Sequence, residues 1–488
     1  MAFEFVNNNT AIDSAARRRI RIHAATGKNA NRTLTRPSKA VVLRGNVAVP
    51  FRNPEAIRRL HRDSKVNAKV ERPVTDGLQF LIPVPASSRG LVRQALFFFS
   101  GVRYNPELEG ALENPDHMGS VWVRYLFLDE AYFHCSVATS ILCSKSLVRE
   151  TAQGMYHIAR TYRIVQERLM SEEEATSDMT IAVLVVMSQY ERLQSQYARG
   201  YVHVRGLRRM IELRGGIKQF DSKCCGVIQK VLRADLEYAL QLGLRTLFGS
   251  EGIEFLRECK DICLNDEKQE EMVANPEVDL FLQKGLRLSL WSTFSNMRRL
   301  ADLLNDAGAG YRRRLGAEQF HNTIMLLGYS LLHISPLNVS TGPGACSMLG
   351  ISPLEDIVHL GLIAFLVTFL RGLNQRIAEN PLLSHRLRLA IEKLLSSVEG
   401  GEEGKIIKRV LIWALFVGAV AVFKPSDDEW LIPTTNTAMN ALGLSSWKDV
   451  KEALAGFPWV DAVHDRTGTV LSTTQKFLSL SNQSDPLP

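Results

Sequence analysis

The sequence predicts an all-α fold, a large multi-helix domain preceded by a flexible, basic N-terminal arm. Apolar residues recur at helical spacing through most of the chain, as at Met155, Ile158, Ala159, Tyr162 and Val165. Alternating apolar and polar residues of the kind that form strands are essentially missing, and so are Asn-Gly hairpin turns. The 488 residues can bury a large core, and 45% hydrophobic with 23% charged residues is ordinary for a globular protein.

Positive charge gathers at the N-terminus. Residues 1–72 contain 16 Lys+Arg and 5 Asp+Glu, whereas residues 73–488 contain 43 and 46. This asymmetry indicates a polyanionic partner, an acidic membrane surface or a nuclear import receptor; a solvated leader with no specific partner is the alternative. The residues that suit phosphate or import-receptor contact form two clusters: Arg17, Arg18, Arg19, Arg21 and Arg58, Arg59, Arg62.

Proline and glycine content predicts the domain boundaries. Residues 1–72 form a largely disordered arm, and residues 73–88 form a proline-containing connector. The helical domain spans 89–475, with a sub-boundary in a Pro/Gly/Ser loop at 335–351, and residues 476–488 form a disordered tail.

Several helix boundaries have clear signals. Asp178 is the predicted N-cap of a helix over 179–197. Gly215 and Gly216 end a helix over 203–214, because glycine accepts the left-handed conformation that follows a helix.

Two later helices have equally clear ends. Ser352 and Glu355 form a predicted capping box. A helix over 446–455 ends before Gly456 and Pro458. The acidic segment 171–178 is predicted to break the helical pattern. The remaining predicted helices cover 91–100, 118–144, 148–170, 225–248, 279–304, 317–332 and 405–423.

Metal and catalytic motifs are not found. The seven cysteines include no two close pairs of the kind that a structural zinc site needs; Cys259 and Cys263 lie one helical turn apart but lack a second pair. The segment 427–429 (Asp-Asp-Glu) is interpreted as a solvated turn, and Arg298, Arg299 and residues 312–314 as solvated faces. We therefore predict no metal, no cofactor and no catalytic residue.

Targeting signals are equally sparse. The apolar stretches 357–370 and 410–423 are shorter than the roughly 20 residues that span a bilayer, so we interpret them as buried helices without membrane contact. The N-terminus is not a secretory signal, although an arginine-rich mitochondrial presequence is a minor alternative. The odd number of cysteines indicates reduced thiols in the nucleus or cytoplasm.

Four segments resemble the fungal-specific transcription factor domain family. They are HVRGLRRMIELRGG at 203–216, SDMTIA at 177–182, the tryptophan-containing helix at 411–419, and Phe-Val-Asn at 5–7 followed by Arg-Ile-Arg-x-His at 19–23. The resemblance covers roughly residues 90–430. The motif residues with a structural role are His203, Gly206, Arg214, Gly215, Gly216 and Trp413.

The resemblance implies an all-α regulatory domain, which in this family usually follows a binuclear zinc cluster of six cysteines. Because this sequence shows no such cluster, the expected function is a nuclear regulator or co-regulator of transcription that pairs with itself or with other regulators. Nucleic-acid binding is then weak and non-specific, and a small-molecule effector is compatible with the domain. The other explanation is an upstream exon that carries the cluster. The alternative class is an all-helical small-molecule-binding protein or enzyme with no role on DNA.

Overall fold

The computed structural model describes residues 91, 95, 106–113, 121–143, 151–220, 225–259, 263–264, 275–338, 352–370, 379–397 and 401–481. Contacts divide the chain into Met1–Pro73 and Val74–Pro488, and every described residue belongs to the second unit. Within the described residues there are seventeen α-helices and no strand; one isolated parallel bridge joins Leu112 to Leu315. The predicted all-α fold is confirmed. The predicted arm, connector and nearly all of the helix over 91–100 lie outside the described residues.

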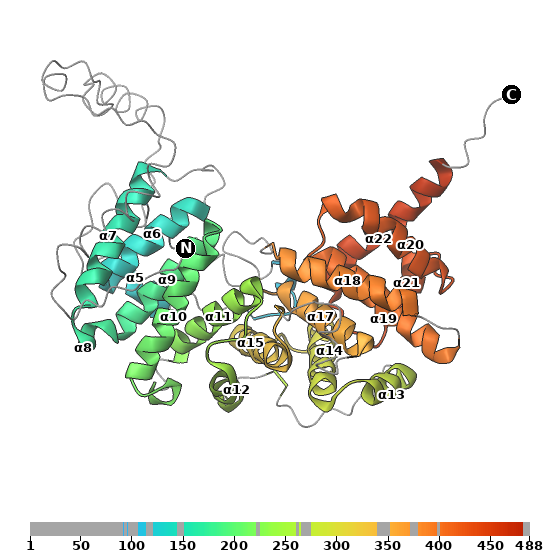
Figure 1. The fold of residues 1–488 in the computed structure, drawn as a ribbon, viewed down its shortest axis with the longest axis horizontal. Helices are drawn as coiled ribbons and strands as arrows, with labels where there is room; N and C mark the ends of the chain where they lie inside the picture. Colours follow the sequence, from blue (N-terminus) through green and yellow to red (C-terminus); the bar gives the residue numbers. More distant parts are fainter. Residues whose placement is uncertain are drawn as a thin grey trace, which may run out of the picture. The chain divides into compact units, whose positions relative to one another are not determined.

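The helices follow one another through short links (Figure 1). Their bounds are α5 Val121–Leu128, α6 Glu130–Cys143, α7 Ala152–Arg168, α8 Glu172–Ala175, α9 Asp178–Leu193, α10 Tyr197–Leu213, α11 Cys225–Leu242, α12 Gly249–Glu258, α13 Pro276–Gly285, α14 Leu288–Gly308, α15 Ala317–Ile334, α17 Pro353–Val367, α18 Pro381–Ser397, α19 Glu402–Ala421, α20 Asp428–Asn440, α21 Trp447–Leu454 and α22 Asp461–Ser481.

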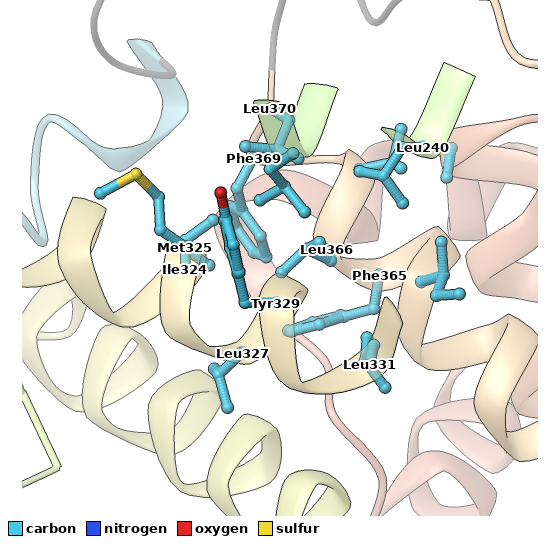
Figure 2. Packing of buried hydrophobic residues seen from close by; sticks show 14 of the residues in the cluster. Leu240, Ile324, Met325, Leu327, Tyr329, Leu331, Phe365, Leu366, Phe369 and Leu370 are labelled. Carbon is cyan, nitrogen blue, oxygen red and sulfur yellow. The ribbon is translucent and has the colours of Figure 1, made fainter. Parts of the chain in front are cut away.

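Two groups of helices share one continuous core. In the first, α6 packs against α7 and α9, and α9 packs against α10 and α11. In the second, α19 lies against α17, α18, α20, α21 and α22. The helix α15 contacts α11 and α12 of the first group and α14 and α17 of the second. Figure 2 shows Tyr329 of α15 beside Leu366 and Phe369, which belong to α17 and its last turn. The core is therefore continuous through α15.

The helix starts with the strongest local signals are confirmed. The Ser352 side chain accepts a hydrogen bond from the Glu355 N–H at 3.1 Å, and Glu355 Oε2 accepts one from the Ser352 N–H at 3.4 Å. Ser446 and Asp449 form the same capping box at the start of α21. These caps use groups within four residues of each other, so the sequence alone contains the information that places them.

Several predicted helices are wrong in their ends. The helix expected over 118–144 is two helices, because the Asp129 side chain caps α6 by accepting from the Tyr132 N–H at 2.7 Å. The helix expected over 225–248 ends at Leu242, where Gly243 takes a φ of 73°. The N-cap of α9 is Ser177, and Asp178 is its first residue.

Other predictions fail because tertiary contacts decide them. The helix expected over 279–304 divides into α13 and α14 at Arg287. Glu355 Oε1 accepts from the Arg287 backbone N–H at 2.8 Å and from its Nε at 3.0 Å, which fixes the start of α14. Helices α8, α12, α18, α20 and α22 were not predicted. The predicted turn at 427–429 contains the first residues of α20, and α22 extends into the predicted tail as far as Ser481.

The contact between α17 and α19 is centred on Trp413. This buried side chain donates from Nε1 to the Pro458 carbonyl at 3.0 Å and stacks on Phe457, with ring centroids 5.6 Å apart. On its other side lies Gly361 of α17, where a Cβ atom would be 2.6 Å from the indole ring. A side chain at position 361 would thus occupy space that the tryptophan fills.

Two buried histidines join α6 to α7. The Nδ1 atoms of His134 and His157 are 2.6 Å apart, so one ring donates a proton and the other accepts. Burial lowers the pKa of His134, against the opposing effect of Glu130, whose Oε1 lies 3.7 Å from its Nε2. Burial and the neighbouring His134 lower the pKa of His157 to about 4. Both imidazoles are therefore neutral at pH 7.

Replacing Gly361 should loosen the α17–α19 contact. We expect Gly361→Ala to lower the free energy of unfolding by roughly 1–3 kcal/mol, because the added methyl group overpacks the indole. Gly206→Ala is the matched control: its Cβ would lie 3.5 Å from Leu184, and alanine favours a helix more than glycine does. Urea denaturation of both variants measures the difference. Equal stability of Gly361→Ala and the wild type would contradict the proposed packing.

The histidine pair should make stability depend on pH. The folded pKa of His157 is about 4, below the unfolded value of about 6.5, so its contribution is complete above pH 6.5 and is lost as pH falls toward 4. Burial raises the pKa of Asp235 to about 6, which acts in the opposite sense over the same range. The test therefore compares the pH dependence of stability in two proteins that both retain Asp235, so that the effect of Asp235 cancels.

We expect the stability of the wild type to fall more steeply between pH 7 and pH 5 than that of the double variant His134→Gln/His157→Gln. The expected difference in slope amounts to roughly 1 kcal/mol or more over this range. Urea unfolding at four pH values provides the two curves. Parallel curves would show that the two histidines have the same pKa values in the folded and unfolded states, which would contradict the lowered pKa of the pair.

Candidate functional site

The motif at 203–216 forms the second half of α10 and its end. The helix buries Val204, Leu207 and Ile211, the face that its spacing predicts, together with Met210. It packs mainly against α9 and also against α11. The opposite face exposes Arg205, Arg209 and Glu212, so the motif is an amphipathic helix at the edge of the core.

The two glycines end α10 as predicted. Gly215 and Gly216 have φ angles of 92° and 95°, in the region that favours glycine. The Gly216 N–H donates to the Ile211 carbonyl at 2.9 Å, and the Gly215 N–H donates to the Glu212 carbonyl at 3.0 Å. This pair of bonds is the Schellman arrangement, which turns the chain back toward α12.

One carboxylate of α12 holds this turn. Glu251 Oε1 accepts from the Ile217 N–H at 3.0 Å, and its Oε2 lies 2.6 Å from the Arg208 guanidinium. Burial alone would raise the pKa of Glu251, but the Ile217 N–H and Arg208 outweigh it and hold the pKa below its ordinary value. Arg208 also bonds Glu212 at 2.8 Å and lies over the Phe248 ring. Arg208 therefore has a structural role, because it joins α10 to α12.

Arg214 joins the end of α10 to the start of α9. Its guanidinium pairs with Asp178 and donates to the Thr176 carbonyl at 3.2 Å. It also lies over the Phe220 ring, 4.0 Å from the centroid. Two of the segments that carry the family resemblance, 177–182 and 203–216, are thus in direct contact through one ion pair.

The remaining motif residues of α10 have simpler roles. His203 is partly buried, and burial lowers its pKa to about 4, so the ring is neutral; it lies 6.3 Å from the Tyr162 ring. Gly206 has room for a methyl group. The glycine that the packing requires is Gly200, where a Cβ would lie 1.6 Å from the Tyr238 hydroxyl. Sequence reasoning missed Gly200, although a glycine inside a helical pattern is a signal of close packing.

Buried carboxylates of α11 complete the connections around the motif. Asp235 accepts from the Leu247 N–H at 2.9 Å, the Phe248 N–H at 3.2 Å and the Tyr329 hydroxyl at 2.7 Å. Glu237 pairs with Arg192 at 2.7 Å and with Arg233 at 2.9 Å. Burial opposes ionisation of Glu237, but the two arginines outweigh it and lower the pKa. These groups position helices.

The described residues include few groups that are placed to bind a metal ion or to act as a nucleophile. No three His, Cys, Asp or Glu side chains in the described ranges are arranged to hold a metal ion. We expected Cys259 and Cys263 to lie one helical turn apart. Instead, α12 ends at Glu258, and Cys259 has an extended backbone. A cavity of about 20 Å³, with space for about one water molecule, is lined by Arg192, Glu237, Leu240, Gln241, Val367, Leu370 and Asn380. Burial raises the pKa of the Cys135 thiol, which disfavours the thiolate.

The arginines that the sequence analysis singled out differ in where the structure places them. The seven predicted phosphate or import contacts, Arg17 to Arg62, lie outside the described residues. Arg298 is not a solvated residue: it pairs with Asp279, and its side chain is 15% exposed. In the loop between α14 and α15, Arg313 is exposed as expected and lies 3.2 Å from Glu113. No helix of the described segments is both long and apolar enough to cross a membrane.

The comparisons with known proteins agree with the motif. The model of the fungal-specific transcription factor domain matches residues 111–454, well over half of the chain. A comparison with curated proteins and a comparison with solved structures find no match. The matched range contains three of the four segments that carry the resemblance, at 177–182, 203–216 and 411–419, whereas the segment at 5–7 and 19–23 lies outside it. The chain therefore belongs to the fungal-specific transcription factor domain family.

Proposed function

We propose that this chain regulates transcription through contacts of its helical domain with other proteins, and that a partner selects the promoter. Membership of the family makes the chain a fungal transcriptional regulator. The observation that supports the finer statement is the cysteine pattern. The seven cysteines, at positions 135, 143, 224, 225, 259, 263 and 346, include no cluster of six that would build a binuclear zinc site.

The structure also supports the idea that the helical domain offers no rigid DNA reader. Sequence-specific recognition requires side chains held against base edges by a rigid element in a groove. Within the described residues, two of the four arginines of the family motif pair with other helices, Arg208 with Glu251 and Arg214 with Asp178, whereas Arg205 and Arg209 are exposed. The proposed partner is a second copy of this chain or a zinc-cluster relative.

Exposed apolar side chains suit such a partner. Met170 is 89% exposed at the end of α7, and Leu288 is 81% exposed at the start of α14. Exposed apolar residues of this size supply the energy of many protein–protein contacts. The proposed pairing therefore uses helix ends that the domain leaves uncovered.

The basic arm has a separate proposed role. Its net charge of +11 within 72 residues suits an import receptor and non-specific contact with phosphate groups. The family implies a nuclear location in general, and we propose that the clusters at 17–21 and 58–62 direct this chain there.

The purified chain should bind DNA without choosing a sequence. We expect dissociation constants of roughly 10⁻⁴ to 10⁻⁶ M at physiological salt for any duplex, because charge alone attracts the phosphates. Fluorescence anisotropy would compare a duplex that the protein occupies in cells with a shuffled version. The full-length variant Arg17→Gln/Arg18→Gln/Arg19→Gln/Arg21→Gln should weaken both equally. A thousandfold preference by the chain alone would refute the need for a partner.

The arm should direct a reporter to the nucleus. Residues 1–72 fused to a cytoplasmic fluorescent protein are expected to accumulate in nuclei, because each arginine cluster presents several guanidinium groups. A matched fusion with glutamine at Arg58, Arg59 and Arg62 should accumulate less. Microscopy of living cells gives the ratio of nuclear to cytoplasmic signal. A fusion that remains wholly cytoplasmic counts against an import signal in this segment.

A further inference from the structure

Four serines beside helix starts are each followed by an acidic residue three positions later: Ser171, Ser352, Ser426 and Ser446. This spacing has two chemical uses. It forms capping boxes at helix starts. Acidic residues shortly after a serine are also what a protein kinase with a basic substrate groove recognises, by charge complementarity. The structure separates the two uses.

Ser352 and Ser446 serve as caps. Each side chain accepts from the backbone N–H three residues on, and each acidic partner accepts in return from the serine N–H. The acids have further partners: Glu355 binds Arg287, and Asp449 accepts from the Ser445 hydroxyl at 2.9 Å. These serines and their carboxylates are occupied by the fold.

Ser171 and Ser426 present a different arrangement. The three residues after each are all acidic, Glu at 172–174 and Asp-Asp-Glu at 427–429. Ser171 is exposed, and so are all three glutamates after it. Ser426 is exposed, as are Asp428 and Glu429. Within the described residues, the carboxylates at 172–174, 428 and 429 have no hydrogen bond or ion pair, so they remain available to a partner.

Neither serine forms a capping box. Ser171 caps α8 by accepting from the Glu174 N–H at 3.4 Å, but the Glu174 side chain does not accept from the Ser171 N–H in return. In the second segment Ser426 lies within a 3₁₀ helix, Pro425–Asp427, and Asp427 is the N-cap of α20, so Ser426 does not cap α20. The acidic spacing at these two serines is therefore not explained by capping.

The segment around Ser171 makes few apolar contacts, although the hydroxyls of Ser177 and Thr180 donate to the Glu174 carbonyl at 2.9 and 2.8 Å. A kinase binds its substrate as an extended strand, so a helical acceptor must unfold locally. The helix α8 has four residues and buries none of them, and the preceding Met170 is 89% exposed. Few packing contacts are lost when such a segment opens. The start of α20 is held more firmly, because Trp430 packs on Phe423 and under Arg388.

We propose that Ser171 and Ser426 are phosphorylation sites for an acidophilic serine kinase, with Ser171 the faster acceptor. In the reaction the serine Oγ forms a bond to the γ-phosphorus of ATP, and the bond from that phosphorus to the bridging oxygen breaks. ADP leaves, and the hydroxyl proton passes to the carboxylate base of the kinase. Each phosphate adds a charge of about −1.5 to −2 beside three carboxylates.

The test uses the full-length chain, a purified acidophilic serine kinase and magnesium-ATP labelled in the γ-phosphoryl group. Mass spectrometry of the wild-type peptides locates the phosphate, so the result does not depend on how a variant folds. We expect phosphate on Ser171 first and on Ser426 later. Ser171→Ala and Ser426→Ala should each remove one phosphate, and the control Ser446→Ala should retain both.

A further variant tests whether the kinase recognises the acidic residues that follow Ser171. Glu172→Gln/Glu173→Gln/Glu174→Gln should slow phosphorylation of Ser171 several-fold and leave the rate at Ser426 unchanged, which makes the second site an internal control. Phosphate on Ser171 alone would support that site and overturn Ser426. Peptides with both serines unmodified, or an unchanged rate at Ser171 in the glutamine variant, would overturn the proposal.

Discussion

The packing of Trp413 against Gly361 is the constraint on which the second group of helices depends. The indole contacts α17 at the glycine, stacks on Phe457 before α22, meets Phe294 of α14 edge to face, and bonds the Pro458 carbonyl. One side chain thus sets the separation of α17 and α19 and the position of the segment that leads into α22. Because α19 lies against six other helices, α13, α17, α18, α20, α21 and α22, its placement fixes theirs. A dense core of this kind tolerates little change in volume.

Polar groups have the corresponding role in the first group of helices. Glu251 and Asp235 each bind backbone N–H groups of a link together with a side chain from another helix. Such bonds act together with buried apolar residues of the same links, Ile217 and Phe248. Removing one partner leaves a buried group unsatisfied, which costs more than the bond contributes when it is formed. The family motif at 203–216 combines the end of α10 with Arg208, whose guanidinium pairs with Glu251.

The fold class, the apolar face of α10, the glycine stop at 215–216, the capping box at Ser352 and the helix that starts at Ser446 were predictable because their causes lie within a few residues. The break at Asp129 was hidden, since an aspartate inside an apolar helical pattern shows its capping role only when the next helix is placed. The split at Arg287 depends on Glu355, which is 68 residues away. A glycine inside a helical pattern signals close packing, but the side chains that require Gly200 and Gly361, Tyr238 and Trp413, are known only from the structure. The phosphate-contact and import arginines lie outside the described residues, so they stay predictions.

The carboxylate of Glu355 belongs to two helix starts at once. It is the third residue of α17 and closes that capping box, and it also receives the backbone N–H and guanidinium of Arg287 at the start of α14. The first turns of α14 and α17 are consequently held by the same carboxylate. Loss of this carboxylate would therefore remove contacts from the first turns of both α14 and α17. A partner bound at the start of α14, where Leu288 is exposed, would lie next to Arg287 and hence beside this shared carboxylate.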